Sequence, residues 1–421
     1  MVRRGQLILL GIWANKLSRF LRLWVLQEIV LARKATFVWG TCSLPWSVMA
    51  DAVCKIREDQ KLRSVVPTRN FTNAFLMSGL WDQQNEKRDK HMFLYLLDIA
   101  RSLEVTNQRD KVFSLLGLPA DEADPETGLV IKPHYEKPTS QVYMEVARTI
   151  MEKNKNLNVL SYVLHGETNL GQTLKNMLWR DKIPSWVPDW SIDKIILPFT
   201  GYIESNCHKA GLSRPMELLT SVSPHVLRLK GVEVDVVKSV GPSVTEYDYI
   251  HESKGKMVKM LNWCMGLDVS LVVLCNTLCG HRDKGQTLVE DDEQYLSDFI
   301  ALLRELEIDF REKWSEETAQ LNALATDKGD AECYKGTLHS YMTYRRPFIT
   351  EKGVLGHGSM GTEAGDSVVV LWGGQLPFVV RGPQGKKRRL IGEAYMHNLV
   401  HGEVEKLLKD KTVEEQIFEF A

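Results

Sequence analysis

One short segment brings an acid and an aromatic side chain close enough to share a reaction site. In Trp24-Val-Leu-Gln-Glu28 the two side chains are four residues apart, about one turn of an α-helix. The indole could then form a pocket wall beside the Glu28 carboxylate. Such a carboxylate suits cleavage of a glycosidic bond, because it can stabilise an oxocarbenium-like centre or orient the attacking group. The alternative is structural, with Glu28 bonded to the scaffold and Trp24 packed in the core.

A second segment, Gly356-His-Gly-Ser-Met-Gly361, has the letter pattern of a dinucleotide-binding loop. That loop requires a helix opening at its third glycine, so that the helix N-terminus faces the pyrophosphate. Here Thr362-Glu-Ala-Gly-Asp366 follows, and then a β-branched strand. We therefore predict no bound cofactor, and we attribute the glycines to positive φ angles in turns of a barrel.

Cys275, Cys279 and His281 suggest a zinc site, but their spacing is not that of a finger or a ribbon. The two cysteines fall one turn apart in an apolar helical run. We predict buried thiols and no bound metal. The chain has seven cysteines, an odd number without paired spacing, which argues against a secreted disulfide framework.

The charge balance excludes several partner classes. Lys+Arg total 53 against 54 for Asp+Glu, so no net field attracts nucleic acid or acidic membranes. The basic run 385–389 is interpreted as a solvated hairpin turn, with a nuclear address or a phosphate patch as the alternative. The apolar stretch within residues 1–14 is too short to span a bilayer, and no small-residue cleavage site follows it. We expect a cytoplasmic protein with no membrane partner.

Helical patterns dominate the first half of the chain and strand patterns the end. We predict helices near 45–56, 90–103 and 139–150, while the polar stretch 63–84 is predicted to be loop-rich. After Pro224, residues 226–237 alternate with period two. Leu227 and Leu229 form one apolar set, and Val232, Val234 and Val236 form the next. A bulge at Lys230-Gly231 would keep both sets on one core. Glycine-rich turns separate further strand signals. Those signals lie at 348–350, 353–355, 367–372, 378–381 and 389–391.

Four segments together point to a known family. They are Arg22–Glu28, Asn107-Gln-Arg-Asp-Lys-Val-Phe-Ser-Leu-Leu-Gly-Leu118, Ile183–Ser191 and Arg346–Gly353. Their order and spacing resemble the fungal heterokaryon-incompatibility (HET) domain proteins, from about Arg19 to Glu403. The second segment matches the family's (N/D)-x-R-D-K motif throughout, and its role in the family is architectural.

Individual side chains of these segments carry structural expectations. We expect Asp110 to cap the helix that follows it and Arg109 to pair with a neighbouring acid. Tyr135 matches a family element in which His134 replaces the usual aspartate. Glu393 and His397, evenly spaced on a predicted strand, are expected to form a structural pair.

The resemblance implies an α+β fold in three parts. These are an α/β HET-domain remnant similar to the Toll/interleukin-receptor (TIR) fold, a helical middle region, and a small antiparallel C-terminal β-barrel with a helical insertion. The family's N-terminal Ala-Leu-Ser-Tyr-x-Trp-Gly and Trp-Ile-Asp-x-x-Cys-Ile-Asn-Gln signatures do not occur in this sequence, so we expect a HET domain that lacks its N-terminal part. The predicted boundaries are 1–42 for the remnant, 43–220 for the middle region, 221–405 for the barrel with its insertion at 246–345, and 406–421 for a C-terminal tail.

The resemblance also implies a function, namely fungal non-self recognition and programmed cell death through an unknown protein partner. A truncated form and an inactive form of such a protein are both open. The HET domain resembles the Toll/interleukin-receptor (TIR) fold, whose NAD-cleaving members carry their catalytic acid in a helical Trp-x-x-x-Glu. Carried over, that pattern makes Glu28 the candidate catalytic residue and Trp24 its pocket wall. The alternatives are therefore an NAD-cleaving hydrolase and a protein-interaction scaffold without enzymatic activity.

Overall fold

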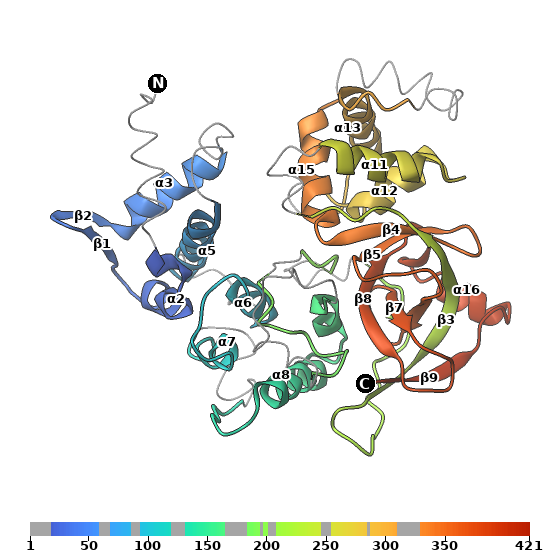
Figure 1. The fold of residues 1–421 in the computed structure, drawn as a ribbon, viewed down its shortest axis with the longest axis horizontal. Helices are drawn as coiled ribbons and strands as arrows, with labels where there is room; N and C mark the ends of the chain where they lie inside the picture. Colours follow the sequence, from blue (N-terminus) through green and yellow to red (C-terminus); the bar gives the residue numbers. More distant parts are fainter. Residues whose placement is uncertain are drawn as a thin grey trace. The chain divides into compact units, whose positions relative to one another are not determined.

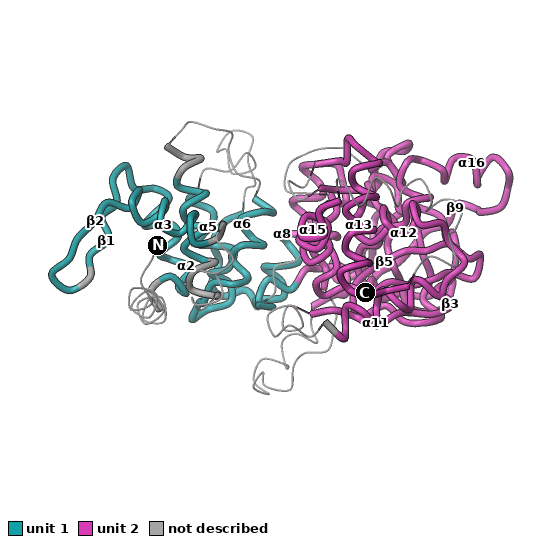
Figure 2. The backbone as a smooth tube through the Cα atoms, turned by 90° about the horizontal axis from the view of Figure 1, so that it is seen from above, with its two compact units in different colours: residues 1–146, 189–195 teal, residues 147–188, 196–421 magenta. Residues whose placement is uncertain are grey.

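The computed structural model describes residues 18–58, 68–85, 93–118, 131–164, 183–193, 197–200, 208–245, 254–283, 287–309 and 329–421. The predicted N-terminal segment 1–14 lies outside these ranges. The chain divides into two compact units, coloured separately in Figure 2. Unit 1 comprises residues 1–146 with 189–195, and unit 2 comprises residues 147–188 with 196–421. Each unit is described by itself.

Unit 1 is built mainly from helices (Figure 1). A 3-10 turn, η1 (Ser18–Leu21), leads into α2 (Leu23–Val30), and a two-stranded antiparallel hairpin, β1 (Thr36–Trp39) and β2 (Cys42–Pro45), follows. Helices α2 and α3 both pack against α5. The remaining helices are α3 (Trp46–Glu58), α5 (Thr68–Asn85), α6 (Phe93–Ala100), α7 (Asp110–Phe113) and α8 (Thr139–Asn154), whose last turns lie in unit 2.

Helix α5 corrects the loop predicted at 63–84. Among the positions of this helix whose side chains are described, the buried apolar ones are Ala74, Met77 and Leu80. The other buried positions there are polar and hydrogen-bonded: Asn73 donates to the Phe20 carbonyl at 3.1 Å, and Ser78 donates to the Ala74 carbonyl of the same helix at 2.8 Å. A helix held partly by polar side chains lacks the apolar period by which helices are recognised in a sequence.

Unit 2 contains the predicted barrel, whose six strands close in the order β3-β4-β5-β8-β7-β6 and back to β3. All pairings are antiparallel, and closure leaves none of these six strands at a free edge. The strands are β3 (Leu227–Val240), β4 (Arg345–Thr350), β5 (Leu355–Ser359), β6 (Ser367–Leu371), β7 (Phe378–Arg381) and β8 (Arg389–Tyr395).

Strand β3 pairs with β6 and β4, which confirms that the strand preceding the insertion belongs to the barrel. The predicted bulge position was wrong: the register with β6 shifts between Glu233 and Asp235, whereas residues 227–232 pair with β9 without a shift. Leu227 and Leu229 are buried outside the described barrel-core cluster that contains Val232, Val234 and Val237. The two apolar sets therefore face different surroundings rather than one core.

The C-terminal segment contributes a strand where the sequence suggested a tail. After the short helix α16 (Val404–Lys409), β9 (Glu415–Phe420) pairs with β3 from Leu227 to Val232. Phe418 and Phe420 are buried. The signal is weak in the sequence because Glu415, Gln416 and Glu419 interrupt the apolar residues and α16 separates the strand from the other barrel strands.

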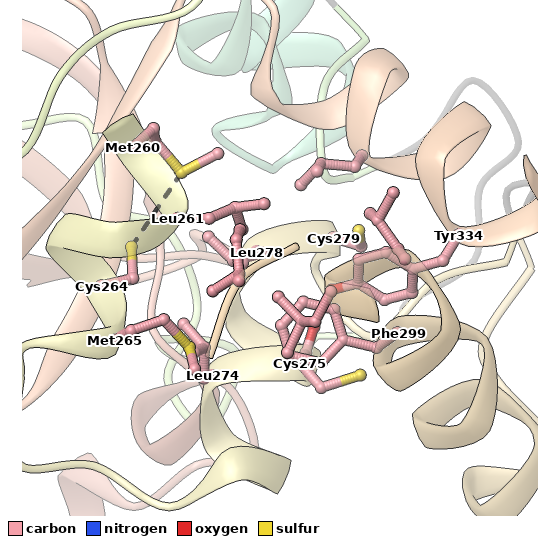
Figure 3. Packing of buried hydrophobic residues seen from close by; sticks show 14 of the residues in the cluster. Met260, Leu261, Cys264, Met265, Leu274, Cys275, Leu278, Cys279, Phe299 and Tyr334 are labelled. Atoms are coloured by element: carbon pink, nitrogen blue, oxygen red, sulfur yellow. Dashed lines mark hydrogen bonds between the residues drawn. The ribbon is translucent and has the colours of Figure 1, made fainter. Parts of the chain in front are cut away.

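Between β3 and β4 the chain forms the predicted helical insertion: α11 (Lys254–Met265), α12 (Leu271–Cys279), α13 (Asp292–Glu305) and α15 (Ala331–Met342). These helices surround a sulfur-rich core that includes Met260, Cys264, Cys275 and Cys279 (Figure 3). Ile349 and Leu355 of the barrel join the same core. The insertion is thus packed onto β4 and β5 through a shared apolar cluster.

The predicted α+β class, with helices in the first half and a small C-terminal barrel, is confirmed. The predicted domain boundaries remain predictions. In the ranges that the structure describes, no helix has both the length and the apolar character needed to cross a membrane.

Candidate functional site

The candidate acid lies at the surface of unit 1. Helix α2 buries Leu23, Leu26 and Ile29 on one face, and the opposite face carries Trp24 and Glu28. The Trp24 side chain is 49% exposed, so it does not pack in the core. Glu28 is also exposed. A carboxylate in water lacks the low-dielectric surroundings in which it best stabilises a developing positive charge. The catalytic role of Glu28 and Trp24 remains a prediction.

The same helix is tied to the (N/D)-x-R-D-K motif by a residue that sequence reasoning missed. Gln27 donates a side-chain hydrogen bond to the Ser114 carbonyl, next to helix α7. Its amide nitrogen lies 3.4 Å from the position that a Cβ would take on Gly117. The glycine of the motif therefore leaves room for Gln27, and the two motifs meet through a backbone contact.

Lys111 is the structural centre of the motif. Its side chain is buried and donates to the carbonyls of Ala100 at 2.5 Å, Arg101 at 3.2 Å and Leu103. These carbonyls lie at the end of α6, where the last helical C=O groups have no partners within the helix. A cation is favoured there by the helix dipole. Lys111 thus caps α6 from outside and uses all three of its donors.

Asp110 and Arg109 both engage Tyr135, which corrects two expectations. Asp110 is the first residue of α7 and does not cap it; its carboxylate accepts a hydrogen bond from the Tyr135 hydroxyl at 2.8 Å. That hydrogen bond raises the pKa of Tyr135. Arg109 donates to the Tyr135 carbonyl rather than to an acid. The loop carrying Tyr135 is therefore held by backbone and side chain together, which agrees with an architectural role.

The aromatic segment Ile183–Ser191 anchors one tryptophan in each unit. Trp190 is fully buried in unit 1, with the Arg101 guanidinium 4.8 Å from its ring centre. Trp186 is fully buried in unit 2, with Arg148 at 5.0 Å. Burial of a large indole against a guanidinium adds cation–π attraction to the apolar contact. These residues fix the connection at both ends.

A buried ion pair lies where the insertion returns to the barrel. Arg345 at the start of β4 contacts Glu393 of β8, with 2.5 Å between Nη2 and Oε1, and both side chains are at most 3% exposed. Arg345 also donates to the carbonyls of Tyr341 at 2.9 Å and Leu197 at 2.8 Å, and Glu393 accepts from the Phe199 N–H at 3.1 Å. Burial raises the pKa of Glu393, while Arg345 opposes that rise.

The sequence of this chain is similar to those of known proteins. Residues 291–413 match the Het-6 beta-barrel domain, which covers the end of the insertion and strands β4 to β8. Across 93% of its length the chain is also 27% identical to heterokaryon incompatibility protein 6, OR allele, of Neurospora crassa. The chain is a homologue of that protein. It spans 65% of the length of this relative. No solved structure shows significant similarity to the chain.

Glu393 does not pair with His397 as predicted. Glu393 points to Arg345, whereas His397 lies beyond β8 in a 3-10 turn, η5 (His397–Leu399). There the Tyr395 hydroxyl lies 3.2 Å from His397 Nδ1. Burial lowers the pKa of His397, and the neighbouring His281 lowers it further.

The thiols expected to be buried lie where the sequence placed them. Cys275 and Cys279 occupy one buried face of α12, and burial raises the pKa of Cys279 to about 12. Tyr334 donates to the Cys275 carbonyl at 2.7 Å. His281 instead contacts Asp292 at 2.8 Å. The described part of the Het-6 homologue contains no cluster of three or more histidine, cysteine or acidic side chains arranged to hold a metal ion.

The glycines of the apparent nucleotide loop have a different purpose from the predicted one. Gly356 and Gly358 lie inside strand β5 without positive φ angles, so the turn explanation was wrong for them. A Cβ on Gly356 would lie 2.5 Å from the Phe348 ring and 2.7 Å from Met396. The glycine is needed for close packing inside the barrel.

The basic run of residues 385–389 forms part of the exposed β7–β8 connection, with one exception. Arg388 is 4% exposed and pairs with Glu233 of β3, at 2.8 Å between Nη1 and Oε2. One of the four basic side chains is therefore structural rather than solvated.

Proposed function

We propose that this protein acts in heterokaryon incompatibility, as a component that recognises non-self after fungal cells fuse and promotes cell death. The single observation that carries this proposal is the extent of the similarity to heterokaryon incompatibility protein 6. It spans 93% of the chain and so includes both compact units rather than the barrel alone.

The buried framework supports the same proposal. The Lys111 cap of α6 and the Arg345–Glu393 pair are structural contacts deep in their units. Residues buried for packing tolerate little change, whereas exposed loops on a rigid scaffold are free to vary and to bind partners. Recognition of a protein partner by exposed loops fits a protein whose relative is named as an allele. We propose such a partner, in the cytoplasm, where buried thiols such as Cys264 stay reduced.

The test is expression of the chain in Neurospora crassa strains of different genetic background. We expect normal growth of each strain alone, and slow growth with uptake of a vital dye after fusion with particular strains. A fluorescent fusion of the same chain reports its location. Equal growth in every fusion, with the protein detected at normal abundance, refutes the proposal.

Two variants sharpen this experiment. Glu28→Ala should retain incompatibility, because the proposed activity depends on recognition rather than on the exposed carboxylate of α2. Lys111→Met should lose it together with protein abundance, and Lys34→Met, at an exposed lysine of the same unit, should behave as wild type. Loss of incompatibility in Glu28→Ala at full abundance would favour the hydrolase instead.

A further inference from the structure

A polar pocket of about 700 Å³ lies in unit 2, outside the motifs discussed above. Four segments far apart in the sequence form it: 154–158 at the end of α8, 209–213, residue 375 after β6, and 401–402. Backbone hydrogen bonds hold these segments together. Lys209 N–H donates to Val400 at 2.6 Å, Ala210 to Gln375 at 3.1 Å, and Leu157 to Gly373 at 3.3 Å. The walls are thus fixed by main-chain contacts, and the volume is typical of small-molecule sites.

The lining combines positive charge with neutral amides. Lys155 and Lys209 contribute two cations and His401 an imidazole, and none of the described residues that line the pocket is acidic. Two acids outside the lining bond to lining residues: Glu403 accepts from the His401 N–H at 2.8 Å, and Glu405 accepts from the Ser213 hydroxyl at 2.8 Å. Glu405 also accepts from Arg214 at 3.3 Å, which offsets its charge. The charge facing the pocket is therefore positive, which favours an anion.

One buried amide in this lining has an unused acceptor. Gln375 is 4% exposed; its Nε2 donates to Asn158 Oδ1 at 3.2 Å, and its Oε1 has no hydrogen-bond partner within the described residues. Buried polar atoms are nearly always hydrogen-bonded in folded proteins. Because Asn158 fixes the orientation of the Gln375 amide, a hydroxyl donor inside the pocket would supply the missing hydrogen-bond partner of Oε1.

The remaining polar lining matches the same kind of ligand. Asn154, Asn156 and Asn158 present amides, each of which both donates and accepts, as a hydroxyl does. None of the described lining residues is aromatic, so none of them would stack on a nucleobase. We propose that this pocket binds a small phosphorylated polyol, of the sugar-phosphate class, with Lys155 and Lys209 on the phosphate and the Gln375–Asn158 pair on a hydroxyl. The proposal does not rest on the function proposed above.

Isothermal titration of the full chain with glucose 6-phosphate, inorganic phosphate and glucose tests this. We expect saturable binding of glucose 6-phosphate, weaker binding of phosphate, and none of glucose. The affinity should fall with added salt, because the attraction between the lysines and the phosphate is screened. Equal affinity for phosphate and glucose 6-phosphate would refute the hydroxyl half of the proposal, and absence of saturable binding would refute all of it.

Matched lysine variants locate the site. The double variant Lys155→Gln/Lys209→Gln changes exposed side chains and should bind glucose 6-phosphate at least about tenfold more weakly, since each charge-assisted hydrogen bond is worth about that factor. The control Lys386→Gln/Lys409→Gln removes the same charge from exposed positions outside the pocket lining and should bind as wild type. Equal losses in the two double variants would overturn the assignment to this pocket.

Discussion

Replacing Lys111 with methionine should destabilise unit 1 more than any surface substitution. Methionine keeps most of the length and apolar character of the lysine stem, so the packing around α7 is largely retained. It removes the ammonium that donates to Ala100, Arg101 and Leu103 at the end of α6. The Ala100 carbonyl still accepts from the Leu103 N–H at 3.1 Å, whereas the Arg101 and Leu103 carbonyls lose the ammonium in a site where Lys111 is only 3% exposed.

The magnitude follows from counting these carbonyls. An unsatisfied buried acceptor costs about 1–3 kcal/mol. Two of them, the carbonyls of Arg101 and Leu103, give at least about 2 kcal/mol at the lower end of that range. Removal of the ammonium also relieves its own desolvation cost, which is why the lower end is the appropriate choice. We therefore expect the free energy of unfolding of unit 1 to fall by about 2 kcal/mol.

Hydrogen–deuterium exchange read by mass spectrometry separates this unit from the barrel. Amides of residues 93–118 should exchange faster in Lys111→Met, while those of 345–395 should be unchanged. Urea unfolding followed by circular dichroism gives the free energy, with Lys34→Met as the matched control. A Lys111→Met loss within about 0.5 kcal/mol of wild type, the usual range of surface substitutions, would refute the capping role.

Three other outcomes are expected. Burial lowers the pKa of His208 to about 3 and that of His357 well below 6.5. Below pH 6.5 the unfolded chain therefore binds protons that the folded chain does not, and the free energy of unfolding of unit 2 should fall by on the order of 1 kcal/mol per pH unit for each histidine. Urea titrations at pH 7 and 5.5 measure this fall, and a flat profile would contradict it. Gly356→Ala should destabilise the barrel by about 1–3 kcal/mol through overpacking. Its melting temperature should fall accordingly, and nucleotide binding should not change. Purified protein should release no nicotinamide from NAD beyond a Glu28→Ala control; turnover that the mutation abolishes would establish the hydrolase.

Local sequence patterns predicted most strands of the barrel. Alternation over residues 226–237 and the glycine-rich turns after residue 345 predicted strands that the structure contains, including a first strand separated from the others by a helical insertion. Side chains point alternately to the two faces of any strand, so the alternation over residues 226–237 predicts a strand without knowledge of its partner. The buried thiols of α12 were predicted for a similar reason, since Cys275 and Cys279 repeat at helical spacing in an apolar run.

Patterns failed where a segment is held by polar contacts to distant residues. Helix α5 looked like a loop because the polar residues Asn73 and Ser78 occupy buried positions, and the burial of Asn73 depends on the distant Phe20 carbonyl. Strand β9 looked like a tail because only its pairing with β3 makes it a strand.

The candidate sites divide in the same way. The sequence by itself determined that Asn107–Leu118 is a structural motif, that Gly356–Gly361 opens no nucleotide-binding helix, and that Glu28 and Trp24 share a helix face. Only the tertiary structure decided that this face is exposed, that Lys111 caps α6, and that four separate segments enclose a polar pocket. Spacing along a helix or strand is set by backbone geometry, whereas burial and long-range hydrogen bonding are set by which other segments arrive there.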